Sequence, residues 1–110
     1  MVYDKGRRFD SRFMSVFILD SGLARHRLGI TASRKMARRA VDRNRAKRLL
    51  REAFRQSSAE LGALKNRYDW VINARRSIIE VKTDAVVADL KRVIAQVRHA
   101  EQESFIGTDT

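Results

Sequence analysis

The segment at residues 42–57 constrains the fold most, because it has one apolar side and one cationic side when it is wound as an α-helix. At about 100° per residue, the apolar side chains form a single stripe: Ala46, Leu49, Leu50, Ala53 and Phe54. Polar and cationic side chains lie almost opposite: Asn44, Arg48, Arg51 and Arg55, with Arg45 and Lys47 beside them. Asp42 is the predicted N-cap. The pattern predicts a helix that packs on a core and leaves a cationic face outside.

Strand-like segments lie on both sides of this helix. Residues 12–20 alternate with both faces largely apolar, and residues 25–33 are apolar on one face and small and polar on the other. Ser21-Gly22 is a turn signal between them, so we expect these two strands to pair antiparallel. Residues 68–75 predict a third strand, and residues 83–99 predict a second amphipathic helix after the polar loop at residues 58–67.

The element order β-β-α-β-α predicts an α+β protein, a small two-layer α/β sandwich with helices packed on one sheet. A length of 110 residues suits one domain. We expect a single domain over residues 1–100 and a flexible C-terminal tail over residues 101–110.

The positive charge of the chain is concentrated in one stretch. The chain has 24 Lys and Arg against 13 Asp and Glu, a net charge of +11. Residues 34–55 alone hold ten basic and two acidic residues, a local charge of +8. Like charges at helical spacing repel each other, so this face indicates a polyanionic partner, and arginine favours bidentate contacts to phosphate. A basic face that only keeps the chain in solution is the alternative.

Several classes of protein are excluded by what the sequence lacks. The chain has no Cys, so disulfides and thiolate metal sites are excluded. It has no apolar run long enough for a membrane span and no apolar stretch like that of a signal peptide, so we expect no membrane partner and a cytoplasmic location. His26 and His99 lack metal-ligand spacing and the acidic residues are scattered, so we expect neither a catalytic centre nor a metal site in the protein itself.

An ordered motif covers residues 29–55. Its lead-in contains Gly29, Thr31, Ser33, Arg34 and Lys35, and its core is Arg43-Asn44-Arg45 followed by a basic helical block that ends at Arg55. Further matches lie at Lys5-Gly6 and Arg12 before it and at Ala74-Arg75-Arg76 after it. Together, from about residue 3 to residue 98, these features closely resemble the bacterial ribonuclease P protein component, in which the core block is known as the RNR motif.

The resemblance implies an α-β-β-β-α-β-α sandwich with a mostly antiparallel central sheet. It also implies a left-handed β-α-β crossover, as in the second domain of a small-subunit ribosomal protein, which handedness rules alone would not predict. By resemblance, the chain is the protein subunit of a ribonucleoprotein endoribonuclease that matures the 5′ end of precursor tRNA. The RNA subunit would carry catalysis with Mg²⁺ in the holoenzyme, one protein would bind each RNA, and the protein alone would bind no cofactor.

The same resemblance assigns two binding surfaces. The helix would face the catalytic RNA through Arg43, Asn44, Arg45, Lys47, Arg48, Arg51 and Arg55. A groove on the sheet would hold the single-stranded 5′ leader of precursor tRNA through Tyr3, Arg12, Phe17, Ser33, Arg34, Lys35, Arg75 and Arg76. Tyr3 and Phe17 would stack on bases. For Phe17 an ordinary core position is an equal alternative, while Phe13 and Trp70 are expected in the core.

The N-terminus departs from the family pattern. Family members usually carry a longer N-terminal helix whose aromatic residues form one wall of the leader groove, and this sequence begins at what resembles the last turn of that helix. Tyr3 is its only aromatic residue. Either the chain starts upstream of the first residue given, or the wall is shortened. A shortened wall would weaken leader binding while docking to the catalytic RNA persists. Ser11 stands where the family usually has Asn, so no metal-binding role is expected there.

Charge alone leaves three alternatives: a ribosome-associated RNA-binding protein, a DNA-binding helix-turn-helix protein and a membrane-surface helix. The first explains the charge but not the ordered motif. The second requires two adjacent helices, whereas strand-like segments flank the cationic helix. The third requires apolar residues beside the basic face, but the core needs the stripe at residues 46–54.

Overall fold

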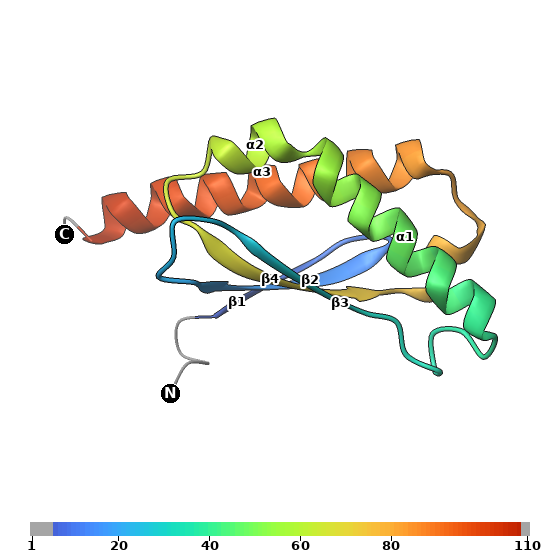
Figure 1. Ribbon diagram of the computed structural model, residues 1–110. Helices are drawn as coiled ribbons and strands as arrows, with labels where there is room; N and C mark the ends of the chain where they lie inside the picture. Colours follow the sequence, from blue (N-terminus) through green and yellow to red (C-terminus); the bar gives the residue numbers. More distant parts are fainter. Residues whose placement is uncertain (1–5, 109–110) are drawn as a thin grey trace.

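A single four-stranded sheet with helices on one of its faces forms the protein in a computed structural model, which describes residues 6–108 and the side chains of residues 6–102 (Figure 1). The strands are β1 (Arg7–Asp10), β2 (Met14–Asp20), β3 (Arg27–Thr31) and β4 (Tyr68–Ala74). The helices are α1 (Ala40–Gln56), α2 (Ser58–Gly62) and α3 (Thr83–Thr108), with the 3-10 helix η2 (Arg76–Glu80) between β4 and α3. The other face of the sheet, which no helix of the described residues covers, is called the open face below.

The strand order is β1-β2-β4-β3, so the predicted pairing of residues 12–20 with residues 25–33 is wrong. β4 lies between these two strands, antiparallel to β2 and parallel to β3, with Val71 opposite both Phe17 and Gly29. β4 takes the centre because its helix-facing side chains are all buried: Tyr68, Trp70, Ile72 and Ala74. β3 has only half-buried or exposed residues, which suits an edge.

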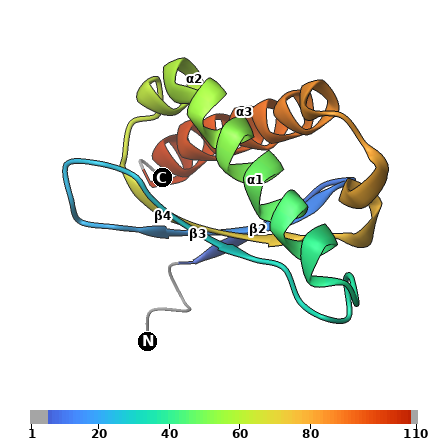
Figure 2. The same ribbon diagram turned by 45° about the vertical axis from the view of Figure 1, so that its right-hand side comes forward.

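The parallel pair β3 and β4 is joined through α1 and α2. In Figure 2 the chain runs left to right along β3, returns above the sheet along α1 and α2, and runs left to right again along β4 behind β3. This path is a left-handed crossover. The two-layer α+β fold with a mostly antiparallel sheet, which the sequence and the resemblance predicted, is therefore confirmed.

The core lies between the helices and the sheet, and both predicted apolar stripes are buried in it. α1 contributes Ala46, Leu49, Leu50 and Ala53, and α3 contributes Val86, Val87, Leu90, Val93, Ile94 and Val97. Phe54 is half-buried and meets Trp70 edge-on, with 6.0 Å between ring centroids. Phe13 and Trp70 are buried, as expected.

Several element boundaries differ from the prediction. α1 begins at Ala40, so Arg39 and not Asp42 is the N-cap; Asp42 lies in the first turn. The chain turns at residues 33–37 and is extended at Arg39. The helix therefore starts directly after Arg39, earlier than predicted. The expected loop at residues 58–67 contains α2. The strand β1 was not predicted from the local pattern, whereas the element order implied by the resemblance includes a third strand before α1.

The second helix is longer than predicted, because α3 continues beyond residue 100 to Thr108. Glu101 accepts hydrogen bonds from the backbone N–H groups of Lys65 and Asn66 and from the Tyr68 hydroxyl, at 2.6–3.1 Å. Burial, together with this carboxylate, raises the pKa of Tyr68 to about 12, so its hydroxyl stays a donor. The predicted boundary at residue 100 therefore falls inside a helix, while the flexibility of the tail stays a prediction.

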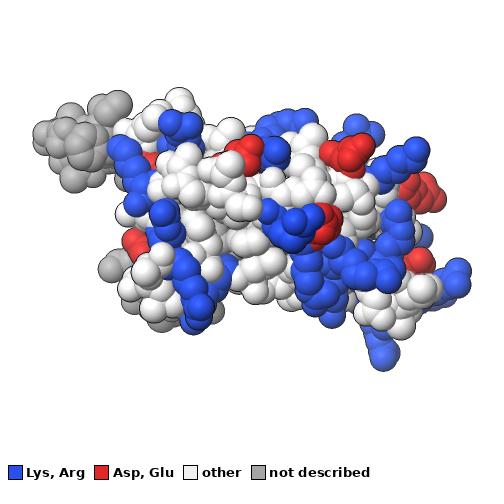
Figure 3. Space-filling view, turned by 45° about the horizontal axis from the view of Figure 1, so that its top comes forward, with Lys and Arg blue, Asp and Glu red and all other residues white. Residues whose placement is uncertain are grey.

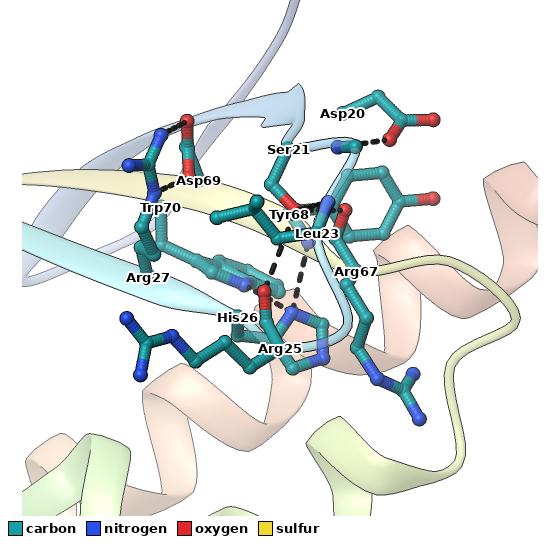
Figure 4. Close-up of polar contacts among 11 residues, drawn as sticks. Asp20, Ser21, Leu23, Arg25, His26, Arg27, Arg67, Tyr68, Asp69 and Trp70 are labelled. Atoms are coloured by element: carbon teal, nitrogen blue, oxygen red, sulfur yellow. Dashed lines mark hydrogen bonds and ion pairs between the residues drawn. The ribbon is translucent and has the colours of Figure 1, made fainter.

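His26 joins the connection between β2 and β3 to the rest of the fold (Figure 4). Its Nδ1 accepts hydrogen bonds from the backbone N–H of Tyr68 and from the indole N–H of Trp70, both at 3.0 Å. Nε2 therefore carries the proton and donates to the Leu61 carbonyl at 3.0 Å. Both ring nitrogens are thus engaged in structural contacts.

Candidate nucleic-acid interface

The outer side of α1 is cationic and exposed. Asn44, Arg48, Arg51 and Arg55 are all exposed, and Lys47 is half-buried beside them. Figure 3 shows Lys and Arg side chains gathered on the right-hand part of the molecule, over the first half of α1 and the segment before it. The predicted opposition of an apolar and a cationic side is confirmed for this helix.

The cations of this face differ in how far they are neutralised. Arg55 donates to both oxygens of Glu52, which lowers the pKa of that carboxyl to about 2, and Gln56 adds a further hydrogen bond to it. Arg48 and Arg51 have no acidic side chain within ion-pairing distance among the described residues. These two arginines are therefore the cations of α1 that are most available to an anionic partner.

Two arginines of the predicted interface are bound to the protein's own backbone. Arg43 donates to the carbonyls of Ala37 and Arg38, at 3.0 and 2.7 Å. Arg45 donates to the carbonyls of Ile79 and Val81, at 2.6 and 3.0 Å. Both side chains are half-buried. Arg43 therefore links the preceding loop to α1, and Arg45 links α1 to η2 and to the residue that follows it. We missed this role from the sequence.

We expect Arg45→Ala to lower the stability of the protein and to leave the salt dependence of RNA binding unchanged. The substitution leaves two carbonyls without their donors in a half-buried site, which costs about 1–3 kcal/mol of unfolding free energy. Urea denaturation of the wild type and the variant measures this loss. Arg45→Lys is the control. The lysine ammonium keeps the positive charge but lacks the forked shape with which the guanidinium donates to two carbonyls. An Arg45→Ala variant with unchanged stability and a reduced salt dependence of RNA binding would contradict this role.

The loop between β3 and α1 presents a second group of cations. Ser33 closes a turn here: its hydroxyl oxygen accepts the Met36 N–H at 3.2 Å, and its carbonyl accepts the N–H groups of Met36 and Ala37. Met36 and Ala37 are buried, whereas the basic residues just before and after them are exposed. The residues around a hollow of about 500 Å³ are Arg34, Lys35, Arg38, Ala40 and Arg43.

The sheet topology brings the predicted groove cations to one end of the sheet. β3 and β4 are parallel and end side by side, with Thr31 opposite Asn73, while Met14 at the start of β2 lies opposite Ala74. The segments just beyond these positions contain Arg12, Ser33, Arg34, Lys35, Arg75 and Arg76, all of them exposed. Tyr3 lies outside the described residues.

The open face of the sheet exposes an aromatic ring. Phe17 is 39% exposed and Val71 is 42% exposed, and they lie in one cross-strand row with Arg8 and Gly29. The Arg8 guanidinium lies over the Phe17 ring, 5.4 Å from its centroid. The core alternative for Phe17 is therefore wrong, and its ring lies where an unpaired base could reach it.

The described residues form neither a metal-binding cluster nor a membrane-spanning helix. In this part of the chain, no group of three or more His, Cys, Asp or Glu side chains could hold a metal ion. No helix formed by the described residues is long and apolar enough to cross a membrane.

Comparison with known proteins decides the family. The family model "Ribonuclease P" matches residues 1–98. The chain belongs to the ribonuclease P protein family. The ribonuclease P protein component of Methylococcus capsulatus is 37% identical over 91 residues, which cover 83% of this chain and 68% of the relative. That of Pelotomaculum thermopropionicum is 37% identical over 90 residues, covering 82% and 77%.

Solved structures of this family have the same fold. The ribonuclease P protein of Staphylococcus aureus matches with a TM-score of 0.71 and 26% identity, over 88% of this chain and 85% of that one. The Thermotoga maritima protein matches with a TM-score of 0.73 and 24% identity, over 86% of each chain. The chain is thus a protein component of ribonuclease P, a ribonucleoprotein enzyme of tRNA processing, and its partner is RNA. The ordered motif at residues 29–55, and not the charge alone, therefore predicted the correct family.

Proposed function

We propose that the chain binds the RNA subunit of ribonuclease P through the outer side of α1 and the 5′ leader of precursor tRNA across the open face of the sheet. The observation that carries the proposal is that two different RNA-compatible surfaces lie on opposite layers of one small domain. The outer side of α1 exposes arginines and no aromatic ring, and the open face exposes Phe17 beside arginines. One molecule can therefore contact two RNAs at once.

The two surfaces suit different forms of RNA. On α1, Arg48, Arg51 and Lys47 would neutralise phosphates of a folded RNA, which positions the partner without reading its sequence. On the open face, the Phe17 ring offers a stacking platform for an unpaired base. The cations at the end of the sheet, Arg34, Lys35, Arg75 and Arg76 with Arg12, would follow the phosphates of a single strand.

The protein's contribution would be positioning and charge, with cleavage carried by the RNA subunit. In the holoenzyme, Mg²⁺ would be held by RNA and the protein would bind no cofactor of its own. One protein per RNA, in the cytoplasm, is the expected assembly. A protein with a net charge of +11 replaces part of the counterion atmosphere of RNA, so it lowers the Mg²⁺ concentration that the complex requires.

Reconstitution tests this proposal. The cognate RNA subunit is incubated with precursor tRNA at low Mg²⁺, with and without the protein, and release of the 5′ leader is measured. We expect little cleavage by the RNA alone and efficient cleavage when the protein is added. The proposal is wrong if the protein cleaves precursor tRNA with no RNA subunit present, or if it changes neither the activity nor the footprint of that RNA.

A further inference from the structure

Asp10 is an acidic residue among the cations of the open face. Its Oδ1 accepts three hydrogen bonds: from Arg8 Nε at 3.0 Å, from the Ser15 hydroxyl at 2.9 Å and from a terminal nitrogen of Arg75 at 2.9 Å. The three donors come from β1, from β2 and from the segment that follows β4. One carboxylate therefore links parts of the chain that are distant in sequence.

The contact with Asp10 determines where two arginines point. Arg8 is held with its guanidinium over the Phe17 ring, and because it bonds Asp10 through Nε, its terminal nitrogens remain free to meet a phosphate. Arg75 is held at the end of the sheet beside the same face. Both arginine side chains stay about half exposed, at 56% and 43%.

A contribution to fold stability is a poor explanation for the presence of a carboxylate on this cationic face. Asp10 is itself 50% exposed, and ion pairs between exposed side chains contribute little to stability. The hydrogen bond from Ser15, followed by the one from Arg8, holds the pKa of Asp10 below its ordinary value, so the group is an anion at neutral pH. An anion on a face that meets phosphates opposes binding by its charge alone. Its contacts suggest a compensating role.

We propose that Asp10 is a positioning residue for the 5′ leader, which orders Arg8 against Phe17 and Arg75 at the sheet end before RNA arrives. The inference rests on the proposed leader site. An arginine that is already ordered loses less side-chain freedom on binding, which is worth about two- to tenfold in affinity per side chain. The Arg8 guanidinium, which is held over the Phe17 ring, is itself a planar cation on which a base can stack.

The test uses the reconstituted holoenzyme with Asp10→Ala and compares its dissociation constants for precursor tRNA and for mature tRNA, which lacks the leader. We expect about fivefold weaker binding of precursor tRNA and unchanged binding of mature tRNA. If Asp10 acted only through its charge, its removal would tighten the binding of precursor tRNA. The sign of the change therefore separates positioning from simple repulsion.

Asp69→Ala is the matched control. Asp69 lies on the same open face and pairs with Arg27, but it contacts neither Phe17 nor the two arginines, so its removal takes away the same charge without disturbing them. We expect no loss of leader affinity from it. Asp10→Asn, which keeps the shape and one acceptor oxygen, should fall between Asp10→Ala and the wild type. In a background of Arg8→Ala with Arg75→Ala, Asp10→Ala should cause no further loss.

Phe17→Ala, measured in the same assay, distinguishes a failure of the inference about Asp10 from a failure of the proposed leader site. If Phe17→Ala weakens precursor tRNA selectively while Asp10→Ala leaves it unchanged or tightens it, the role of Asp10 is overturned and the leader site stands. If Phe17→Ala weakens both tRNAs equally, the open face is not the leader site and both proposals fall. Melting temperatures of all variants, expected to stay close to the wild type, show whether the fold is intact.

Discussion

Replacing Arg48 and Arg51 together by alanine is expected to weaken assembly with the RNA subunit by about ten- to a hundredfold and to flatten its salt dependence. Each lost phosphate contact removes about 0.7–0.9 from the slope of log K against log salt, so the double variant should lose about 1.5. Both side chains are exposed on α1 and no acidic side chain among the described residues pairs with them. Filter binding across a salt series measures both quantities.

The fold should survive this double substitution, because alanine is the best helix former and neither arginine packs in the core. Arg98→Ala is a matched control, since Arg98 is an exposed arginine on α3 and lies outside the α1 face. Arg55→Ala should weaken RNA binding less than Arg48→Ala or Arg51→Ala alone, because Arg55 already pairs with Glu52. A salt slope identical to that of the wild type would remove the outer side of α1 from the RNA interface.

Local patterns in the sequence were sufficient for the elements that bury a regular stripe. The helical spacing from Ala46 to Ala53 and from Val86 to Val97 predicted which sides of α1 and α3 are buried, because burial of those stripes is what holds the helices on the sheet. The local pattern did not predict β1, because Phe9 is its one residue that packs against the core and the strand shows no alternation of apolar and polar residues. The left-handed crossover came from the family resemblance alone.

Strand pairing could not be read from the sequence, because it depends on competition between distant segments. A turn signal at Ser21-Gly22 favoured pairing of the neighbouring strands, but β4 buries more apolar surface and displaces β3 to the edge. The end of α3 was missed for a related reason. Glu101 anchors it to backbone N–H groups of residues 65 and 66, contacts that no local pattern reveals.

The sequence predicted the exposed residues of the candidate site but not the residues that hold other parts of the site in place. The helical wheel correctly placed Arg48 and Arg51 outside. It could not show that Arg45 reaches the carbonyls of Ile79 and Val81, which are distant in sequence. In the same way, Asp10 meets Arg75 only because β1, β2 and β4 assemble side by side. Residues that orient other residues are therefore seen only in the folded chain.

Phe17→Ala is expected to weaken the binding of precursor tRNA to the holoenzyme by about five- to a hundredfold while leaving mature tRNA unaffected. Stacking of one base on an aromatic ring contributes about 1–3 kcal/mol, and the leader is the part of the substrate that supplies unpaired bases. Phe17 is 39% exposed on the open face, so its truncation leaves no cavity in the core and little change in stability. Equilibrium binding of the two tRNAs to the reconstituted holoenzyme measures the difference.

Two variants isolate the contribution of the ring. Phe17→Tyr keeps an aromatic face and should retain most of the affinity for the leader. Val71→Ala removes an exposed apolar side chain from the same cross-strand row, where Val71 lies directly opposite Phe17, but it removes no ring. If stacking is the source of the affinity, Val71→Ala should cost much less than Phe17→Ala. If the two substitutions weaken precursor tRNA to the same extent, the open face contributes general apolar contact, and Phe17 has no special role in holding the leader.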